Sequence, residues 1–260
     1  MLLLCGCGSL SPIDGQRVIA QNEVRGETSL TGWPKESDSS YQIIYNFDGT
    51  PDGANPDTTL LPVNGMLYGT TASGGQNNNG TAFAISAAGK ERVLYSFKGT
   101  PDGSNPRAGL VYVDGRFYGT TTGGGTKGDG TVFEVTISGK ERVLHSFENV
   151  PDGYYPLAPL IAVDGALYGT TFYGGSSACG GSSSGYPGCG TVFTVTRSGR
   201  ERVLHRFKGG RDDGAGPWAP LLAIGGELYG TAVGGGEYDA GVVYKIGESG
   251  KDRIIHVFRG

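Results

Sequence analysis

Four copies of one sequence pattern, about 50 residues apart, make up most of this chain. GKERVLYSFKGTPDG at residues 89–103 returns as GKERVLHSFENVPDG at residues 139–153, and two looser copies follow. Two other segments, LYGTT and GTVF in their commonest forms, recur in order between these anchors. Repetition at such a period indicates stacked supersecondary units. A residue present in every copy is therefore expected to serve the fold, and function is expected where the copies differ.

Each copy contains four short strand signals and no competing helical period. In the second copy they fall at residues 110–113, 116–121, 131–136 and 141–147. Two-residue turns that require positive φ separate the first two strands of each copy, at Asn64-Gly65, Asp114-Gly115, Asp164-Gly165 and Gly225-Gly226. A four-stranded antiparallel meander repeated in this way predicts an all-β fold, a β-propeller with blades of about 50 residues.

The number of blades depends on how the N-terminal residues are interpreted. YQIIYNF at residues 41–47 matches a fourth strand whose first three strands should precede it. We expect a single propeller domain over residues 1–260, most simply five-bladed, with residues 1–47 as a degenerate blade. The alternative is a four-bladed ring with an N-terminal extension. In both cases the regular blades span residues 48–97, 98–147, 148–207 and 208–258.

The pattern LYGTTxxGGxxxxGTVFxxxxxGxExVLxSF resembles the bacterial GloVer-type tandem repeats of choice-of-anchor surface and secreted proteins. The resemblance covers residues 41–260, although the fourth copy has Ala232 and Val242 where the pattern has threonine. It implies an exported β-propeller and supplies no defined reaction, since a fold by itself does not specify one.

Composition excludes some classes of partner. The net charge of −4 leaves no basic footprint for nucleic acid. No apolar run approaches the roughly 20 residues needed to span a bilayer, so we expect a protein that does not cross a membrane, and a monomer. Leu4-Cys5-Gly6-Cys7 resembles a lipoprotein cleavage box behind a leader too short to function. We therefore expect an extracytoplasmic protein, whether secreted, periplasmic or lipid-anchored through a truncated leader.

Cys179 and Cys189 bracket a glycine- and serine-rich insertion found only in the third copy. We expect a disulfide that closes this loop; two free thiols are the alternative. A zinc site is disfavoured because the chain has only three histidines and none is near these cysteines in sequence. The histidines, His145, His205 and His256, occupy the strand position of Tyr45 and Tyr95, which indicates a packing role.

The loops between copies carry a recurring aspartate. Pro-Asp-Gly favours a β-turn without any ligand. The other interpretation is that acidic loops on one face of a ring converge on its axis and bind Ca²⁺, which accepts six to eight oxygen ligands. The candidate metal ligands are Asp52, Asp102, Asp152 and Asp213.

One loop position breaks the symmetry of the repeat. After the last proline of successive loops the copies carry Asp57, Arg107, Leu157 and Trp218. A mixture of acid, base, aliphatic and aromatic residues suits a single off-centre pocket, although an exposed position that has drifted would give the same pattern. Further candidates for substrate binding in the divergent copies are Tyr154, Tyr155, Tyr173, Glu237 and Tyr238.

Two functions fit these residues, of which we expect the first, with the second as the alternative. The first is a Ca²⁺-dependent hydrolase of a small lactone or ester, in which Asp57 acts as ligand or general base and Arg107 stabilises developing negative charge. The second is a non-catalytic glycan-binding propeller in which tyrosine and tryptophan faces stack on sugar rings. The aromatic residues gather in the third and fourth copies, which favours one composite site for a small-molecule or glycan ligand.

Overall fold

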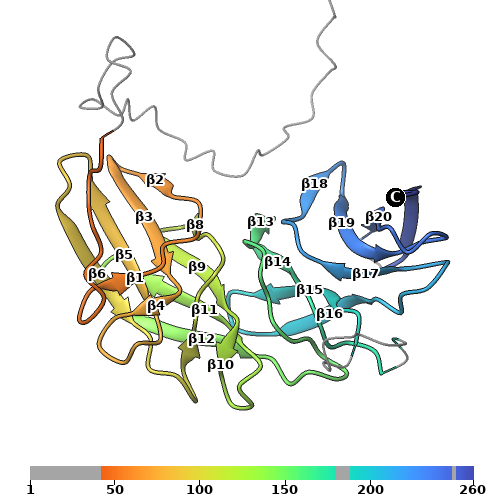
Figure 1. Ribbon diagram of the computed structural model, residues 1–260, viewed down its shortest axis with the longest axis horizontal. Coiled ribbons are helices and arrows are strands. Elements are labelled where there is room, and N and C mark those ends of the chain that lie inside the picture. The colour runs from red at the N-terminus through yellow and green to blue at the C-terminus, as the bar shows by residue number, and fades with distance from the viewer. Residues whose placement is uncertain (1–41, 178, 180–187, 248–249) are drawn as a thin grey trace, which may run out of the picture.

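The computed structural model describes residues 42–177, 179, 188–247 and 250–260. Each of the four copies forms its own antiparallel sheet in this part of the chain, and the sheets follow one another in an arc (Figure 1). The all-β fold with propeller-like sheets is as predicted. Among these residues there is no helix with the length and apolar character needed to cross a bilayer.

The sheet of the second copy shows the common plan. Its strands are β8 (Val111–Val113), β9 (Arg116–Thr121), β11 (Thr131–Thr136) and β12 (Glu141–Ser146), hydrogen-bonded in the order β12-β11-β9-β8. The first copy repeats this plan with β2 (Leu61–Val63), β3 (Met66–Thr71), β5 (Thr81–Ser86) and β6 (Glu91–Ser96). The third does so with β13 (Ile161–Val163), β14 (Ala166–Thr171), β15 (Thr191–Thr196) and β16 (Glu201–Arg206). The fourth does so with β18 (Leu222–Ile224), β19 (Glu227–Gly235), β20 (Val242–Gly247) and β21 (Asp252–Val257).

The predicted two-residue turns are present in all four sheets. Both central residues have positive φ, for example 47° at Asp114 and 82° at Gly115. This geometry matches the right-handed twist of the flanking strands. The asparagine, aspartate and glycine residues at these positions therefore determine where each copy reverses direction.

The two internal sequence anchors contact each other. A Cβ on Gly119 would lie 2.7 Å from the Phe133 ring, so the glycine of FYGTT makes room for the phenylalanine of GTVF. The hydroxyls of Thr121 and Thr131, one from each anchor, are 2.8 Å apart. In the fourth copy Ala232 lies opposite Val242 in the strand register. Its two departures from the pattern are therefore one coupled exchange of a hydrogen-bonded pair for an apolar pair.

The hydrophobic core lies between consecutive sheets. Tyr68 of the first sheet stacks on Phe117 of the second, with ring centroids 4.2 Å apart. Equivalent clusters join the second sheet to the third and the third to the fourth. Face-to-face burial of this kind is the main source of stability in stacked repeats.

The loops contain a second set of short strands that the sequence analysis did not predict. β1 (Gly53–Ala54) pairs with β4 (Ser73–Gly74), and β7 (Gly103–Ser104) pairs with β10 (Gly123–Gly124). In the third copy a single Tyr154–Tyr173 bridge replaces this ribbon, and in the fourth β17 (Gly214–Pro217) extends it along β19. The loop between copies and the long loop within a copy therefore lie together at one end of each sheet.

Residues 42–47 pack on the first sheet as an outer strand packs on the sheet that follows it. Ile44, Tyr45 and Phe47 contact Leu67, Phe83 and Ile85. A Cβ on Gly89 would lie 2.2 Å from the Ile44 carbonyl oxygen, just as one on Gly139 would lie 2.4 Å from that of Leu94. The other strands expected for a degenerate blade fall in residues 1–41, outside the described residues, and the blade number stays a prediction.

Candidate functional site

The four loop aspartates lie apart, each within its own copy. Asp102 accepts a hydrogen bond from the Tyr95 hydroxyl at 2.8 Å, and its carboxylate also accepts from the Lys98 amide at 2.9 Å. Asp52 repeats this arrangement with Tyr45. Asp152 and Asp213 lie against His145 and His205, 2.8 Å and 3.2 Å from the imidazole Nε2 atoms. These contacts also explain why tyrosine and histidine interchange at that strand position.

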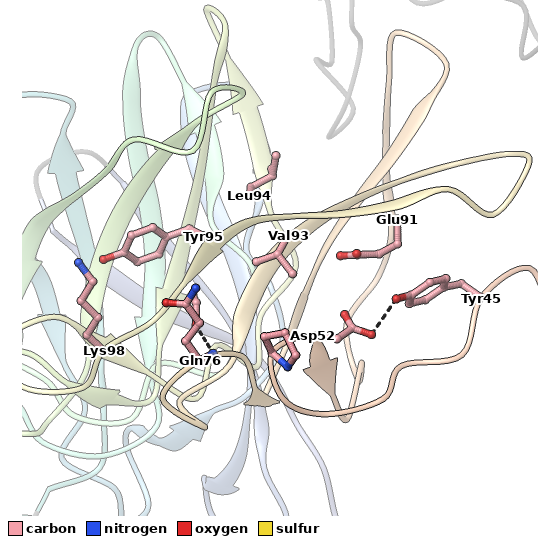
Figure 2. A pocket seen from close by; sticks show the side chains of 10 residues that line it. Tyr45, Asp52, Gln76, Glu91, Val93, Leu94, Tyr95 and Lys98 are labelled. Atoms are coloured by element: carbon pink, nitrogen blue, oxygen red, sulfur yellow. Dashed lines mark hydrogen bonds between the residues drawn. The ribbon is translucent and has the colours of Figure 1, made fainter.

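A carboxyl group on the outer strand of the sheet that follows each loop completes the cluster. Glu91 lies near Asp52, as Figure 2 shows, and Glu141 near Asp102. Burial, followed by the charge of the neighbouring aspartate, raises the pKa of the Glu91 and Glu141 carboxyls to about 7, and burial together with Asp152 does the same at Glu201. We call these groups the junction clusters: Tyr45–Asp52–Glu91, Tyr95–Asp102–Glu141, His145–Asp152–Glu201 and His205–Asp213–Asp252.

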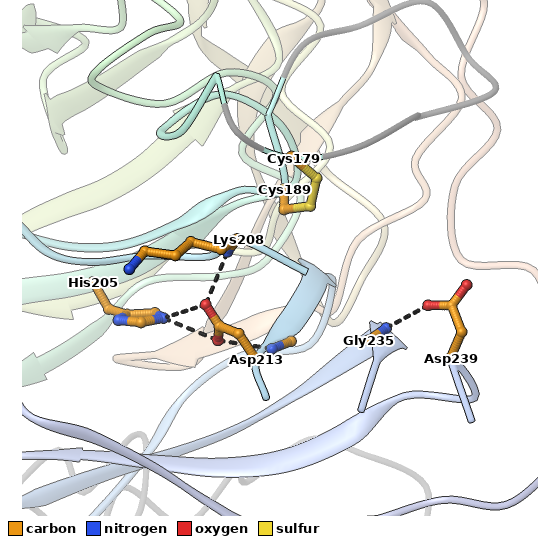
Figure 3. The surroundings of a disulfide bond; sticks show 8 residues. Cys179, Cys189, His205, Lys208, Asp213, Gly235 and Asp239 are labelled. Carbon is orange, nitrogen blue, oxygen red and sulfur yellow. Dashed lines mark hydrogen bonds and ion pairs between the residues drawn. A yellow bond between two sulfur atoms is a disulfide. The ribbon is translucent and has the colours of Figure 1, made fainter. Parts of the chain in front are cut away.

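The prediction that the four aspartates converge on one axial ion stays a prediction. Two junction clusters have a geometry that could hold a metal ion, His145–Asp152–Glu201 and His205–Asp213–Asp252. Among the described residues no such group combines two of the four aspartates. Each carboxylate instead contacts a tyrosine or histidine of the preceding segment and a nearby backbone amide. Figure 3 shows this for Asp213, which accepts hydrogen bonds from the amides of Lys208 and Gly214.

The residues of the mixed loop position separate into different surroundings. Arg107 donates to Asp57 at 3.2 Å across two copies, and both side chains are close to half exposed. Leu157 is half-buried. Trp218 is 57% exposed and meets the Phe172 ring edge-on, with centroids 5.2 Å apart. The structure thus pairs the acidic residue of this position with the basic one. It places the tryptophan with aromatic residues of the third copy.

These aromatic residues form a contiguous surface. The rings of Tyr154 and Tyr173 stack at 5.9 Å, Tyr155 lies 5.6 Å from Tyr154, and Phe172 lies 4.6 Å from Tyr173. We call the five residues the aromatic cluster: Tyr154, Tyr155, Phe172, Tyr173 and Trp218. The sequence analysis missed Phe172, although a signal was present, because the other copies carry Ala72, Thr122 and Val233 at that position.

Tyr155 adopts a conformation that bulky residues rarely adopt. Its φ is 62°, and the equivalent positions of the other copies hold Asn55, Asn105 and Gly216, all with positive φ. Asparagine and glycine tolerate this region, whereas a bulky side chain is strained in it. Strain of this kind is found at functional sites, where the surrounding structure maintains it.

A cavity of about 330 Å³ adjoins the aromatic cluster. Phe172, Tyr173, Lys208 and Asp239 line it together with Cys179 and Cys189. These cysteines form the predicted disulfide (Figure 3). The cavity lies at the lower end of the usual size range for ligand pockets and has mixed polar and apolar walls. The copy-specific insertion thus contributes to the wall of a copy-specific cavity.

The last two predicted binding residues lie in other contacts. Glu237 forms an ion pair with Arg211. The ring of Tyr238, 49% exposed, faces the Arg259 guanidinium at 5.7 Å. No ring contact joins Tyr238 to the aromatic cluster among the contacts of the described residues.

Comparison with known families agrees with the repeat described above. The Gloeobacter/Verrucomicrobia repeat model matches residues 33–182, more than half of the chain. The chain belongs to this family. The matched region includes the first two copies and most of the third. No curated protein matches the chain.

Three solved structures show a distant likeness in fold. They are the xyloglucan PUL GH43B of Bacteroides ovatus (18% identity, TM-score 0.41), a presumed gluconolactonase (15%, 0.48) and a puromycin-hydrolysing peptidase of Mycobacterium tuberculosis (12%, 0.45). The alignments cover 79%, 79% and 78% of this chain but 42%, 64% and 29% of those chains. At these scores they bear on neither activity nor ligand.

Proposed function

We propose that this repeat protein binds a glycan, without catalysis, on the aromatic cluster and the adjoining cavity. The observation that carries the proposal is the replacement, in one copy only, of four small or polar loop residues by Tyr154, Tyr155, Phe172 and Tyr173. Their rings contact one another, and a fifth ring, that of Trp218, joins them from the fourth copy. A position kept for the fold would hold the same residue type in every copy.

An aromatic surface with polar groups at its edge is suited to bind a sugar ring. A sugar ring has an apolar C–H face and a polar rim of hydroxyls. Rigid aromatic side chains bury the apolar face with little loss of side-chain entropy, and polar groups at the edge select the rim. Lys208 and Asp239 on the cavity wall supply such groups.

Cation-dependent hydrolysis of a lactone or ester is the alternative function. The observation in its favour is the contact between Asp57 and Arg107, an acid beside a cationic group. The pair is exposed to solvent, whereas electrostatic catalysis depends on a site that excludes water. Glycan binding needs neither this pair nor an ion, so the two functions respond differently to chelation.

The test is binding of soluble polysaccharides by affinity electrophoresis, followed by calorimetry on the glycan that binds. Tyr173→Ala and Trp218→Ala are expected to weaken binding about tenfold each, the scale of an aromatic hot spot. The matched control is Tyr238→Ala, which removes an exposed aromatic ring outside the cluster. Binding should persist after exhaustive treatment with EDTA. Lactone turnover that EDTA abolishes, without saturable glycan binding, would favour the hydrolase.

The disulfide also bears on where the protein acts. Disulfides persist in oxidising compartments and are rare in reducing cytosol. Together with the glycan ligand, this supports an extracytoplasmic location as part of the same proposal.

A further inference from the structure

One face of the fourth sheet carries exposed aliphatic side chains beside the Glu227–Lys245 ion pair. These side chains come from two strands: Leu222 and Ile224 lie on β18, and Ile255 lies on β21. We call Leu222, Ile224 and Ile255 the end face. Large aliphatic side chains exposed together on a sheet indicate a contact surface.

Comparison with the equivalent positions of the earlier copies shows that the end face lacks a covering sheet. Ile255 occupies the position of Leu94, Leu144 and Leu204, whose exposures are 7%, 8% and 8%, whereas that of Ile255 is 45%. Leu222 occupies the position of Leu61, Val111 and Ile161, which are 2%, 9% and 3% exposed, whereas Leu222 is 46% exposed. In every earlier copy these positions are buried against the sheet that follows. The end face is therefore the surface on which one more sheet would pack.

The chain also contains the outer strand of one more sheet. Residues 42–47 cover the opposite end of the arc, on the first sheet, in the position of an outer strand (Figure 1). In the second copy, β8, β9 and β11 all lie within the 30 residues from Val111 to Lys140 that precede β12. The 41 residues that precede residue 42 are long enough for the same three strands.

We propose that residues 1–41 cover the end face, so that one sheet built from residues 1–47 contacts both the first and the fourth sheets and closes the ring. The burial would be similar to that at the other interfaces, where the equivalent side chains are 2–9% exposed. A second copy of the chain is the competing occupant.

Photo-crosslinking on the full chain tests which occupant is present. Leu222 is replaced by p-benzoylphenylalanine, and the products are analysed by gel and by mass spectrometry. The expected result is a crosslink within one chain to a peptide from residues 1–41. The same replacement at Ile137, a 44% exposed residue outside the end face, should give none. A crosslink between two chains, or only to neighbouring residues of the fourth sheet, would overturn the proposal.

A charge placed on the end face gives an independent measurement. Ile255→Glu should lower the Tm of the full chain by roughly 5 °C or more, because a buried unpaired charge is costly. Ile137→Glu, at matched exposure, should change it by less than about 2 °C. Equal small changes in both variants would contradict coverage of the end face.

Discussion

The loops of the second and third copies share backbone pairing, but the third carries aromatic side chains where the second carries small or polar ones. The Thr122 amide donates to the Asn105 carbonyl at 3.1 Å, and in the third copy the Phe172 amide donates to the Tyr155 carbonyl at the same distance. Gly123 pairs with Ser104 as Tyr173 pairs with Tyr154. Backbone hydrogen bonds thus hold the loop in both copies, while only the third presents an aromatic surface.

The comparison separates residues that maintain the repeat from residues that are free to change. The junction clusters occur at every boundary between copies and connect each loop to the next sheet. The aromatic cluster occurs once. We expect substitutions that remove this difference between the copies to have the effects below, the largest first.

Giving the third copy the loop residues of the second should abolish glycan binding. The variant Tyr154→Ser, Tyr155→Asn, Phe172→Thr, Tyr173→Gly copies Ser104, Asn105, Thr122 and Gly123. We expect affinity to fall by about a hundredfold or more, since several contact rings are lost together. The sheets should remain folded because the backbone pairing is shared. Calorimetry and thermal melting measure the two effects, and undiminished affinity in a folded variant would place the binding site elsewhere.

Tyr155→Asn alone should change stability and affinity in opposite directions. Asparagine relieves the strain of a tyrosine at positive φ, so the free energy of unfolding should rise by about 1 kcal/mol. Affinity for the glycan should fall about tenfold with the loss of one ring. Tyr154→Ser is the control, since it removes a ring without a change in strain. Lower stability in Tyr155→Asn, measured by denaturant unfolding, would show that Tyr155 serves packing alone.

The junction clusters should make stability depend on pH. The pKa of Glu141 is raised to about 7 in the folded protein, against 4.5 as its ordinary value. The folded state therefore binds more protons than the unfolded state between these values, and the free energy of unfolding should fall as the pH rises from about 4.5 through 7.

Glu141→Gln removes this ionisation. At pH 8 it should stabilise the protein by about 1 kcal/mol, a figure discounted for the partial exposure of the carboxyl, and it should flatten the pH dependence of unfolding. The control is Glu148→Gln, whose side chain is exposed. Loss of stability at pH 8 in Glu141→Gln, with no such loss in the control, would show that the ionised carboxylate is bound favourably, for example by a cation.

Much of the fold could be predicted because its signals are local. Asn64-Gly65 and its equivalents specify each hairpin, and the strand alternation follows from adjacent residues. The loop ribbons could not be predicted, because β1 and β4 are two residues long and have little strand propensity. They pair through backbone groups that no side-chain pattern reveals.

The site was predictable only in part, for a different reason. Tyr154, Tyr155, Tyr173 and Trp218 were found because they differ among the copies. The carboxyl partners of the aspartates were not predicted, because they are distant in sequence: Glu141 follows Asp102 by 39 residues and reaches it only when the sheets stack. Their presence in every copy already indicated a role in the repeat itself.

The loop pairing seen at Tyr154 and Tyr173 also makes the protein a suitable scaffold for engineered binding surfaces. Because main-chain amides and carbonyls hold these loops, as the equal 3.1 Å contacts of Asn105 and Tyr155 show, the outward side chains can be exchanged without redesign of the scaffold. The third copy already carries aromatic side chains on this pairing. A library randomised at Ala54, Ser104 and their neighbours could place new recognition surfaces on the first and second copies.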